Sequence, residues 1–322
     1  MTIVVSTGVA SALRDHRPVV ALESAVVTAG MPRQVWNASW PSEALDDRWN
    51  RDQPTNLEIA RAMHRAVESR GGVPAMVAVL GGTLHIGLED DQLMELAGDD
   101  AACKASMTTL AQRITSGATA GTTVSGTLAA IAAHGNQIRT LATGGIGGVH
   151  RRWTQDLDIS ADLRALATVP MCVLCSGAKS ILDLPATMLS LEALGVPVVG
   201  IGVDRLPAFL STAHPTSTAI ASVRDPGELS DLCTTQWKTL GRTASVLGVQ
   251  PVPSKWSICP EDVDAIIATH DEATNADDQR TPHLLGALVE ATQGRSLDAN
   301  VALLLNNAQT ATDVATAIAS QA

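Results

Sequence analysis

Aromatic side chains are nearly absent from this chain of 322 residues. They make up 2% of the sequence, with no tyrosine, one phenylalanine (Phe209) and six tryptophans. The chain therefore has few rings on which the bases of a nucleic-acid strand can stack. Positive charge is also scarce, since 22 Lys and Arg residues against 33 Asp and Glu residues give a net charge of −11. These two deficits exclude a nucleic-acid polymer as an expected partner.

Long apolar runs and paired cysteines are missing as well. No segment approaches the roughly 20 apolar residues that a membrane span needs, and no signal-peptide pattern opens the chain. Five cysteines, an odd number spread along the sequence, predict free thiols in a reducing, cytoplasmic compartment. Cys172 and Cys175 form a C-x-x-C pair, but they lie in an apolar run that predicts a buried strand. Positions three apart in a strand point to opposite faces, so a redox or zinc pair is not favoured.

The remaining composition is that of a folded protein. Hydrophobic residues make up 45% of the chain and charged residues only 17%. The length allows one large domain or two ordinary ones of roughly 150 residues. No Gly/Ser linker or charge run divides the chain, which predicts a single domain over residues 1–322. Residues 33–53, which hold three of the six tryptophans, are interpreted as an inserted loop or short helix.

Short apolar, β-branched runs alternate with longer segments of helical periodicity. Several of the runs are apolar at every position, which is typical of strands covered on both faces. Gly81-Gly82 between two such runs predicts a hairpin, so the sheet is expected to be mixed. The pattern predicts an α/β fold with three α/β/α layers and a mixed, largely parallel central sheet. The predicted strands are Pro18–Leu22, Pro74–Leu80, Ile138–Ala142, Val169–Cys175 and Val196–Ile201.

Helices are predicted between these strands and through most of the last hundred residues. Thr55-Asn-Leu-Glu58 has the pattern of a capping box, and Gly71-Gly72 is a plausible stop for the helix that it opens. From about residue 226 onward the pattern becomes mainly helical. The predicted helices are Asn56–Arg70, Gly121–His134, Ser160–Ala167, Lys179–Leu194, Pro226–Leu247, Pro260–Thr269, Pro282–Thr292 and Asp298–Ala319.

A glycine-rich block, Thr143–Arg151, follows a predicted strand directly, where α/β sheets present ligand loops. It is not a G-x-G-x-x-G motif, because His150 takes the place of the third glycine. Gly177-Ala-Lys179-Ser180 ends like a Walker loop but lacks the upstream glycine. Dinucleotide and nucleoside-triphosphate sites are therefore not indicated. The block is either a set of backbone donors for an anion or a tight turn.

Several segments together resemble the indigoidine synthase A family of pseudouridine-5'-phosphate glycosidases, also called pseudouridylate synthases. The similarity runs in chain order from about residue 18 to Asn307, and the glycine block, Asp158–Leu163 and Ser176–Asp183 are its most specific parts. The matching segments are Val20–Ser24, Gly30–Pro32, Gly72–Ala75, Gly121–Val124, Ala142–Arg151, Asp158–Leu163, Ser176–Asp183, Leu191–Pro197 and Pro207–Phe209.

The resemblance implies a homotrimeric, manganese-dependent lyase of pseudouridine catabolism. Such an enzyme reversibly splits the carbon–carbon glycosidic bond of pseudouridine 5'-phosphate into uracil and ribose 5-phosphate. By this resemblance Lys179 is the nucleophile that forms an imine with C1' of the sugar, and Glu23 is the proton donor. Asp158 is the ligand of the Mn²⁺ ion, or of Mg²⁺ or another divalent ion in its place. The implied substrate contacts are Lys104, Val124, Ser160, Ala161 and Asp162.

The chemistry explains why an amine is needed beside the carboxylates. A carbon leaving group departs as a carbanion equivalent, and an imine at C1' of a ring-opened ribose is an electron sink that eases this departure. Lys179 must be uncharged to attack. We expect it to enter a helix directly after Gly177, where the positive helix end and desolvation favour the neutral amine.

Other interpretations of the same residues remain open. Glu23 and Asp158 alone suit a sugar-phosphate glycosidase that uses a carboxylate pair and no imine. Met107-Thr108-Thr109 stand where the family commonly carries basic residues, which also allows a catalytically impaired sugar-phosphate-binding protein. His150 is either a ligand or a packed turn residue. Asn306-Asn307 are either buried hydrogen bonders near the site or part of a polar stripe.

Overall fold

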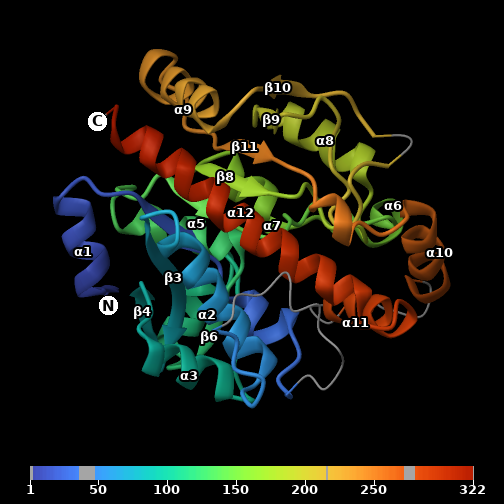
Figure 1. Ribbon diagram of the computed structural model, residues 1–322, viewed down its shortest axis with the longest axis horizontal. Helices are drawn as coiled ribbons and strands as arrows, with labels where there is room; N and C mark the ends of the chain where they lie inside the picture. Colours follow the sequence, from blue (N-terminus) through green and yellow to red (C-terminus); the bar gives the residue numbers. More distant parts are fainter. Residues whose placement is uncertain (1–2, 36–47, 215–216, 272–279, 322) are drawn as a thin grey trace.

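The computed structural model describes residues 3–35, 48–214, 217–271 and 280–321. Residues 36–47, which make up most of the segment predicted to be an insertion, lie outside the described residues. Figure 1 shows strands at the centre of the molecule with helices packed around them. The strands are β1 (Ile3–Val5), β2 (Val19–Leu22), β3 (Val73–Leu80), β4 (Thr83–Ile86), β5 (Cys103–Ala105), β6 (Ala120–Thr122), β7 (Thr140–Ala142), β8 (Cys172–Cys175), β9 (Val198–Ile201), β10 (Ala221–Val223) and β11 (Val246–Val249).

The helices divide into short ones between strands and longer ones near the end of the chain. One turn of π-helix, η1 (Val26–Gly30), follows β2, a second, η2 (Thr235–Thr239), follows α9, and η3 (Ser254–Trp256) is a 3₁₀ turn. The α-helices are α1 (Thr7–Arg14), α2 (Thr55–Glu68), α3 (Asp90–Gly98), α4 (Leu110–Thr115), α5 (Val124–Ala133), α6 (Trp153–Asp156), α7 (Ala161–Leu166), α8 (Leu184–Ala193), α9 (Pro226–Thr234), α10 (Pro260–Asp271), α11 (Arg280–Ala291) and α12 (Arg295–Ala319).

The sheet has the order β1-β4-β3-β2-β7-β8-β11-β9-β10, with β6 pairing β3 and β5 pairing β6. All of these pairs are parallel except β3 with β4 and β3 with β6. The predicted fold class, a mixed and largely parallel sheet between helices, is confirmed, as are the five predicted strands. The predicted hairpin is also present, because Gly81 and Gly82 both adopt the positive φ that a tight two-residue turn requires.

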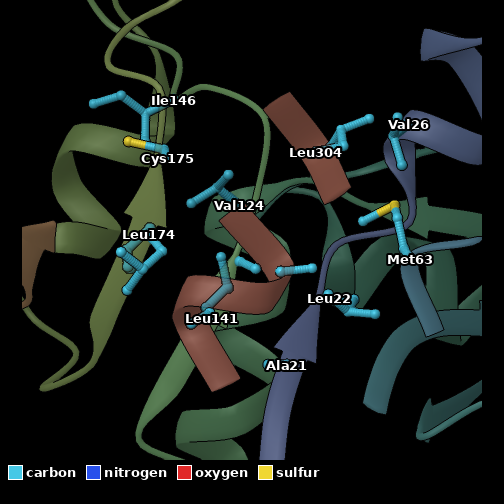
Figure 2. Packing of buried hydrophobic residues seen from close by; sticks show 14 of the residues in the cluster. Ala21, Leu22, Val26, Met63, Val124, Leu141, Ile146, Leu174, Cys175 and Leu304 are labelled. Atoms are coloured by element: carbon cyan, nitrogen blue, oxygen red, sulfur yellow. The ribbon is translucent and has the colours of Figure 1, made fainter. Parts of the chain in front are cut away.

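The centre of the sheet is buried on both faces. Every residue of β2 and of β8 is buried. The long helix α12 packs against β2, β7 and β8 and lies between α2 and α9 (Figure 1). Figure 2 shows Leu304 of α12 in one apolar cluster with Leu22, Leu141 and Leu174 of those three strands. The aliphatic core expected from the scarcity of aromatic residues is therefore present, and α12 holds the middle strands from one side.

Four details of the predicted helices are wrong. The helix predicted from Gly121 begins only at Val124, because Ala120–Thr122 form β6, which pairs with β3 and β5. The segment from Lys179 is not helical until Leu184, because Ala178 and Leu182 pair as β-bridges with the glycine block and so engage the backbone. The helix predicted over Pro226–Leu247 stops early, and its last residues begin β11 between β8 and β9. The capping box is absent from α2, whose N-cap is Pro54.

Glu58, the second residue of the predicted capping box, instead joins an ion-pair network between α2 and α3. Its carboxylate lies 2.8 Å from the Arg61 guanidinium, which also contacts both carboxylate oxygens of Asp90 at 2.7 Å. The predicted stop of α2 is correct, since Gly71 has a φ of +79°. Cys172 and Cys175 are buried and free, as the strand interpretation requires. In the part of the chain that the structure describes, no helix is long and apolar enough to cross a bilayer.

Candidate active site

Both predicted catalytic residues and the glycine block follow the carboxyl ends of three neighbouring parallel strands. Glu23 comes directly after β2, the glycine block after β7, and the loop from Ser176 to Lys179 after β8. Because the three strands run in the same direction, these segments meet at one edge of the sheet, where α/β folds bind their ligands. Residues more than 150 positions apart in the sequence are thereby brought together.

A cavity of about 890 Å³ opens at this edge. It is larger than the two other described cavities, of about 290 and 240 Å³. All eight residues that the resemblance assigns to the site line it: Glu23, Lys104, Val124, Asp158, Ser160, Ala161, Asp162 and Lys179. The structure thus brings together the whole predicted set, while the role of each residue stays a prediction.

Glu23 is buried, with 8% of its surface exposed, and of the carboxyl groups in this set only Asp162 is less exposed. Its Oε2 accepts a hydrogen bond from the backbone N–H of Val26 at 3.3 Å, and its Oε1 accepts one from the Thr143 hydroxyl at 3.4 Å. Burial raises the pKa of Glu23, and the nearby positive charge of Lys179 opposes this rise. Glu23 therefore keeps its proton to higher pH than an exposed glutamate, as a proton donor should.

Lys179 is half-buried in the loop after β8. Its backbone N–H donates to the carbonyl oxygen of Ile146 in the glycine block at 3.1 Å. Gly177, two residues earlier, has a φ of +88°, and a Cβ there would overlap the carbonyl oxygen of Pro207. The prediction that Lys179 opens a helix is wrong, because α8 begins only at Leu184. The amine of Lys179 is therefore not at the N-terminal end of a helix. A loop pinned to the glycine block positions Lys179 instead.

Asp162 ties two backbone segments of the site together. Its Oδ1 accepts from the backbone N–H of Ser125 at 2.8 Å, and its Oδ2 accepts from the N–H of Gly147 at 2.9 Å. The contact requires glycine at 147, because a Cβ there would collide with the Ser160 hydroxyl. Asp162 therefore fixes the first turn of α5 against the glycine block, a role that its position in the sequence did not indicate.

Asp158 and His150 lie side by side at the wall of the cavity. The His150 Nε2 is 3.7 Å from the Asp158 Oδ2, and the backbone N–H of His150 donates to the Asp158 carbonyl oxygen at 3.1 Å. His150 is thus a buried turn residue that also faces the cavity. Among the described residues no group of three or more His, Cys, Asp or Glu side chains is placed to hold a metal. The single carboxylate of Asp158 fits only a hard divalent ion that takes one protein ligand and keeps most of its water ligands.

Hydroxyl groups gather around Lys104 at the same cavity. Ser106 and Thr108 lie 2.8 Å apart through their hydroxyls, and Thr123 and Ser125 lie 3.0 Å apart. We call Ser106, Thr108, Thr109, Thr123 and Ser125 the hydroxyl cluster; all five line the cavity. The sequence predicted only a lack of basic residues here. The available signal for the cluster was a Ser-x-Thr-Thr run after β5, which the fold brings near the Thr-Thr-x-Ser at the start of α5.

Asn307 is a buried hydrogen bonder behind the site, which settles one of the open alternatives. Its amide donates to the Thr143 carbonyl oxygen at 2.9 Å and to the Ser176 hydroxyl at 3.2 Å. Its Oδ1 accepts from the Gln250 side chain at 2.9 Å. Helix α12 therefore holds the start of both the glycine block and the Lys179 loop.

A family model described as "Indigoidine synthase A like protein" matches residues 51–317. The chain belongs to this family. A pseudouridine-5'-phosphate glycosidase of Paracoccus denitrificans is 40% identical and is covered over 99% of both chains. One from Deinococcus radiodurans is also 40% identical, over 95% of this chain and 92% of the relative. These matches confirm the family resemblance found in the sequence.

Two solved structures of similar proteins share the fold of this chain. An indigoidine synthase A-like protein of Thermotoga maritima has a TM-score of 0.84 at 26% identity, with 99% of this chain and 97% of that chain covered. The prealnumycin C-glycosynthase AlnA, solved with ribulose 5-phosphate, has a TM-score of 0.83 at 30% identity, covering 100% and 98%. The fold assignment therefore extends over the whole chain.

Proposed function

We propose that this chain reversibly cleaves the carbon–carbon glycosidic bond of pseudouridine 5'-phosphate to give uracil and ribose 5-phosphate. The relatives that match nearly the whole chain bear the name of this activity. The observation that carries the proposal is the pairing of Glu23 and Lys179, which follow β2 and β8, line one cavity and interact electrostatically. A buried acid beside an amine is the arrangement that imine chemistry at a sugar carbon needs.

The charged end of the substrate would bind at Lys104 and the hydroxyl cluster. One ammonium and several hydroxyl donors line this part of the cavity. The family commonly has basic residues where this chain has Met107-Thr108-Thr109. In this chain the hydroxyl groups would donate hydrogen bonds to the phosphate in their place. Binding of ribulose 5-phosphate by the related C-glycosynthase supports a sugar phosphate in such a cavity.

The remaining predicted contacts surround the sugar. Val124 supplies a buried apolar wall, and Ser160 and Ala161 start α7 next to the glycine block. Asp162 would act through the backbone it holds, since each of its oxygens already accepts an N–H. We infer that these residues orient the ribose so that C1' faces Lys179.

In the proposed reaction the uncharged Lys179 amine adds to C1' and displaces the ring oxygen, which takes a proton from Glu23. The nitrogen, now an ammonium, returns one proton to the Glu23 carboxylate, and Glu23 passes this proton to C5 of the uracil ring. The C1'–C5 bond breaks, its electron pair returns to the pyrimidine, and the nitrogen lone pair forms the C1'=N bond. Water hydrolyses this imine, which releases ribose 5-phosphate and regenerates the amine.

Asp158 would hold a divalent ion such as Mn²⁺ at the edge of the cavity. The ion would supply positive charge that orients sugar or phosphate oxygens. His150, which contacts Asp158, would keep that carboxylate turned toward the cavity.

Trapping the imine tests the proposal directly. Borohydride added with ribose 5-phosphate should leave one stable adduct on Lys179, detected by peptide mass spectrometry, and Lys179→Ala should abolish both adduct and uracil release. Lys104→Ala is the matched control, because it should weaken binding but keep the adduct. If Lys179→Ala keeps turning over, a carboxylate-pair glycosidase replaces the proposal. If the native protein with Mn²⁺ releases no uracil, it is a binding protein.

We also propose that the active protein is a cytoplasmic homotrimer. Three buried free thiols, Cys172, Cys175 and Cys233, support a reducing compartment. Light scattering on a sizing column, which would give about three times the chain mass of 33.4 kDa, tests the trimer.

A further inference from the structure

A second cavity of about 240 Å³ adjoins the large one. We call it the side pocket. The two cavities share part of their walls, between the last residues of η1 on one side and α11 with α12 on the other. The shared residues are Ala29, Gly30, Phe209, Leu285 and Asn300. The side pocket is thus an extension of the candidate active site.

Beyond the shared wall the side pocket is lined mainly by aliphatic side chains. Met31, Leu210, Leu288 and Leu297 are all buried and belong to it. No Asp, Glu, Lys, Arg or His is among its lining residues in the described part of the chain. Ser296 also lines it with 4% exposure, and the Ser296 hydroxyl has no hydrogen-bond partner among the described residues. Such a pocket suits an uncharged, mostly apolar group with room for one polar atom.

The shared wall lies close to the proposed proton donor. Ala29, Phe209 and Leu285 are apolar residues of the large cavity that also border the side pocket, and Asn300 adds an amide to the same wall. Glu23 stands just before η1, whose last residues form this wall. The bond broken in the proposed reaction joins C1' to the base, so a base held beside Glu23 lies next to the side pocket.

We propose that the side pocket admits an apolar substituent on the base of a C-riboside 5'-phosphate, so that N-alkylated pseudouridine 5'-phosphates are substrates as well. This inference rests on the proposed function and extends its range of substrates. N1 and N3 of the uracil ring lie away from the C5 that bears the sugar. A short alkyl chain on either nitrogen points away from C1', in the direction of the side pocket.

Two residues offer a way to fill the side pocket without touching the large cavity. Gly286 and Val289 lie one turn apart on α11 and line the side pocket only. A Cβ at Gly286 would meet no atom within 4 Å, and a side chain suits a helix interior better than glycine does. Gly286→Phe and Val289→Phe each add a ring there, while Gly286→Ala is a matched control that adds almost no volume.

Binding is measured by calorimetry in a Lys179→Ala background, which holds substrates without turning them over. We expect one of the N1- and N3-propyl derivatives to bind within about tenfold of pseudouridine 5'-phosphate itself. Adding Gly286→Phe or Val289→Phe should raise the Kd of that derivative by at least about tenfold and leave the Kd of the parent compound within about twofold. Adding Gly286→Ala should change neither Kd.

The result has clear contrary outcomes. The proposal is overturned if the protein binds pseudouridine 5'-phosphate but neither propyl derivative. It is also overturned if the two Phe variants lose equal affinity for the parent compound and for the derivative. Failure of the parent to bind at all overturns it too. Failure of the native protein to release uracil from a parent that binds overturns the proposed reaction but leaves the pocket assignment standing. The two claims are therefore tested separately.

Discussion

The side-chain amide of Asn307 donates a 2.9 Å hydrogen bond to the carbonyl oxygen of Thr143, a residue 164 positions earlier in the chain. Thr143 in turn donates through its hydroxyl to Glu23. The same amide reaches Ser176, which begins the loop that carries Lys179. One fully buried side chain on α12 thus connects through Thr143 to Glu23 and holds the start of the loop that carries Lys179.

Asn307→Ala should lower both stability and turnover. It leaves the Thr143 carbonyl and the Gln250 side chain without their buried partner, at a cost of about 1–3 kcal/mol for each unsatisfied group. We expect a lower urea midpoint and a fall in kcat larger than the change in KM. Asn306→Ala is the control, since this half-buried neighbour should lose less than about 0.5 kcal/mol. Equal effects of the two changes would show that the hydrogen bonds of Asn307 do not support the site.

Gly177→Ala should displace Lys179. The positive φ alone costs a non-glycine residue about 1–2 kcal/mol, and the new Cβ also overlaps the Pro207 carbonyl oxygen. Gly241→Ala has a similar φ of +61° with no atom within 4 Å, so it isolates the backbone strain. We predict that only Gly177→Ala slows borohydride trapping on Lys179. Normal trapping in a folded Gly177→Ala protein would mean that the loop tolerates the shift.

Glu23→Gln should change how stability depends on pH. Burial makes the Glu23 pKa higher in the folded chain than its ordinary value of 4.5, so the folded state binds the proton more tightly than the unfolded state. The stability that this proton gives is complete below pH 4.5 and is lost as pH rises through the folded pKa. The Tm of Glu23→Gln minus that of the native protein should therefore grow as pH rises.

Lys179→Ala supplies the companion measurement for Glu23. The Lys179 charge lowers the Glu23 pKa, so removing it should extend the loss of stability to higher pH. Calorimetry at closely spaced pH values checks both variants. A Tm difference between Glu23→Gln and native protein that does not vary with pH would contradict a raised pKa for Glu23.

Asp158→Asn should weaken Mn²⁺ binding by at least about tenfold, because the amide lacks the negative charge that a hard divalent ion prefers. Titration of the protein with Mn²⁺, followed by electron paramagnetic resonance, measures this without any substrate. Asp156→Asn is a nearby control, since Asp156 pairs with Arg152 at 3.6 Å and does not line the cavity. An unchanged Mn²⁺ affinity in Asp158→Asn would remove Asp158 as the metal ligand.

The central strands could be predicted because their sequences are apolar at every position. Pro18–Leu22 and Val169–Cys175 contain β2 and β8, whose residues are buried on both faces. The site residues could be predicted because the motifs that carry them resemble those of a known family; without that resemblance their positions alone did not single them out. Local pattern was sufficient wherever one segment determines its own structure.

The errors arose where distant segments decide the local backbone. Lys179 is followed by helix-like periodicity, yet bridges from Ala178 and Leu182 to the glycine block keep the segment extended until Leu184. Val246–Val249 continues a helical pattern but fills the gap between β8 and β9. The bonds of Asp162 to Ser125 and Gly147 likewise depend on tertiary packing, which no spacing in the sequence reveals.

Helix α12 follows every described strand in the chain, and it covers β2, β7 and β8 while anchoring the segments that carry the reactive groups. A nascent chain that ends before α12 lacks the surface on which its middle strands settle. Catalytic competence should therefore arise only once α12 has left the exit tunnel, and truncations that remove α12 should yield inactive and protease-sensitive fragments.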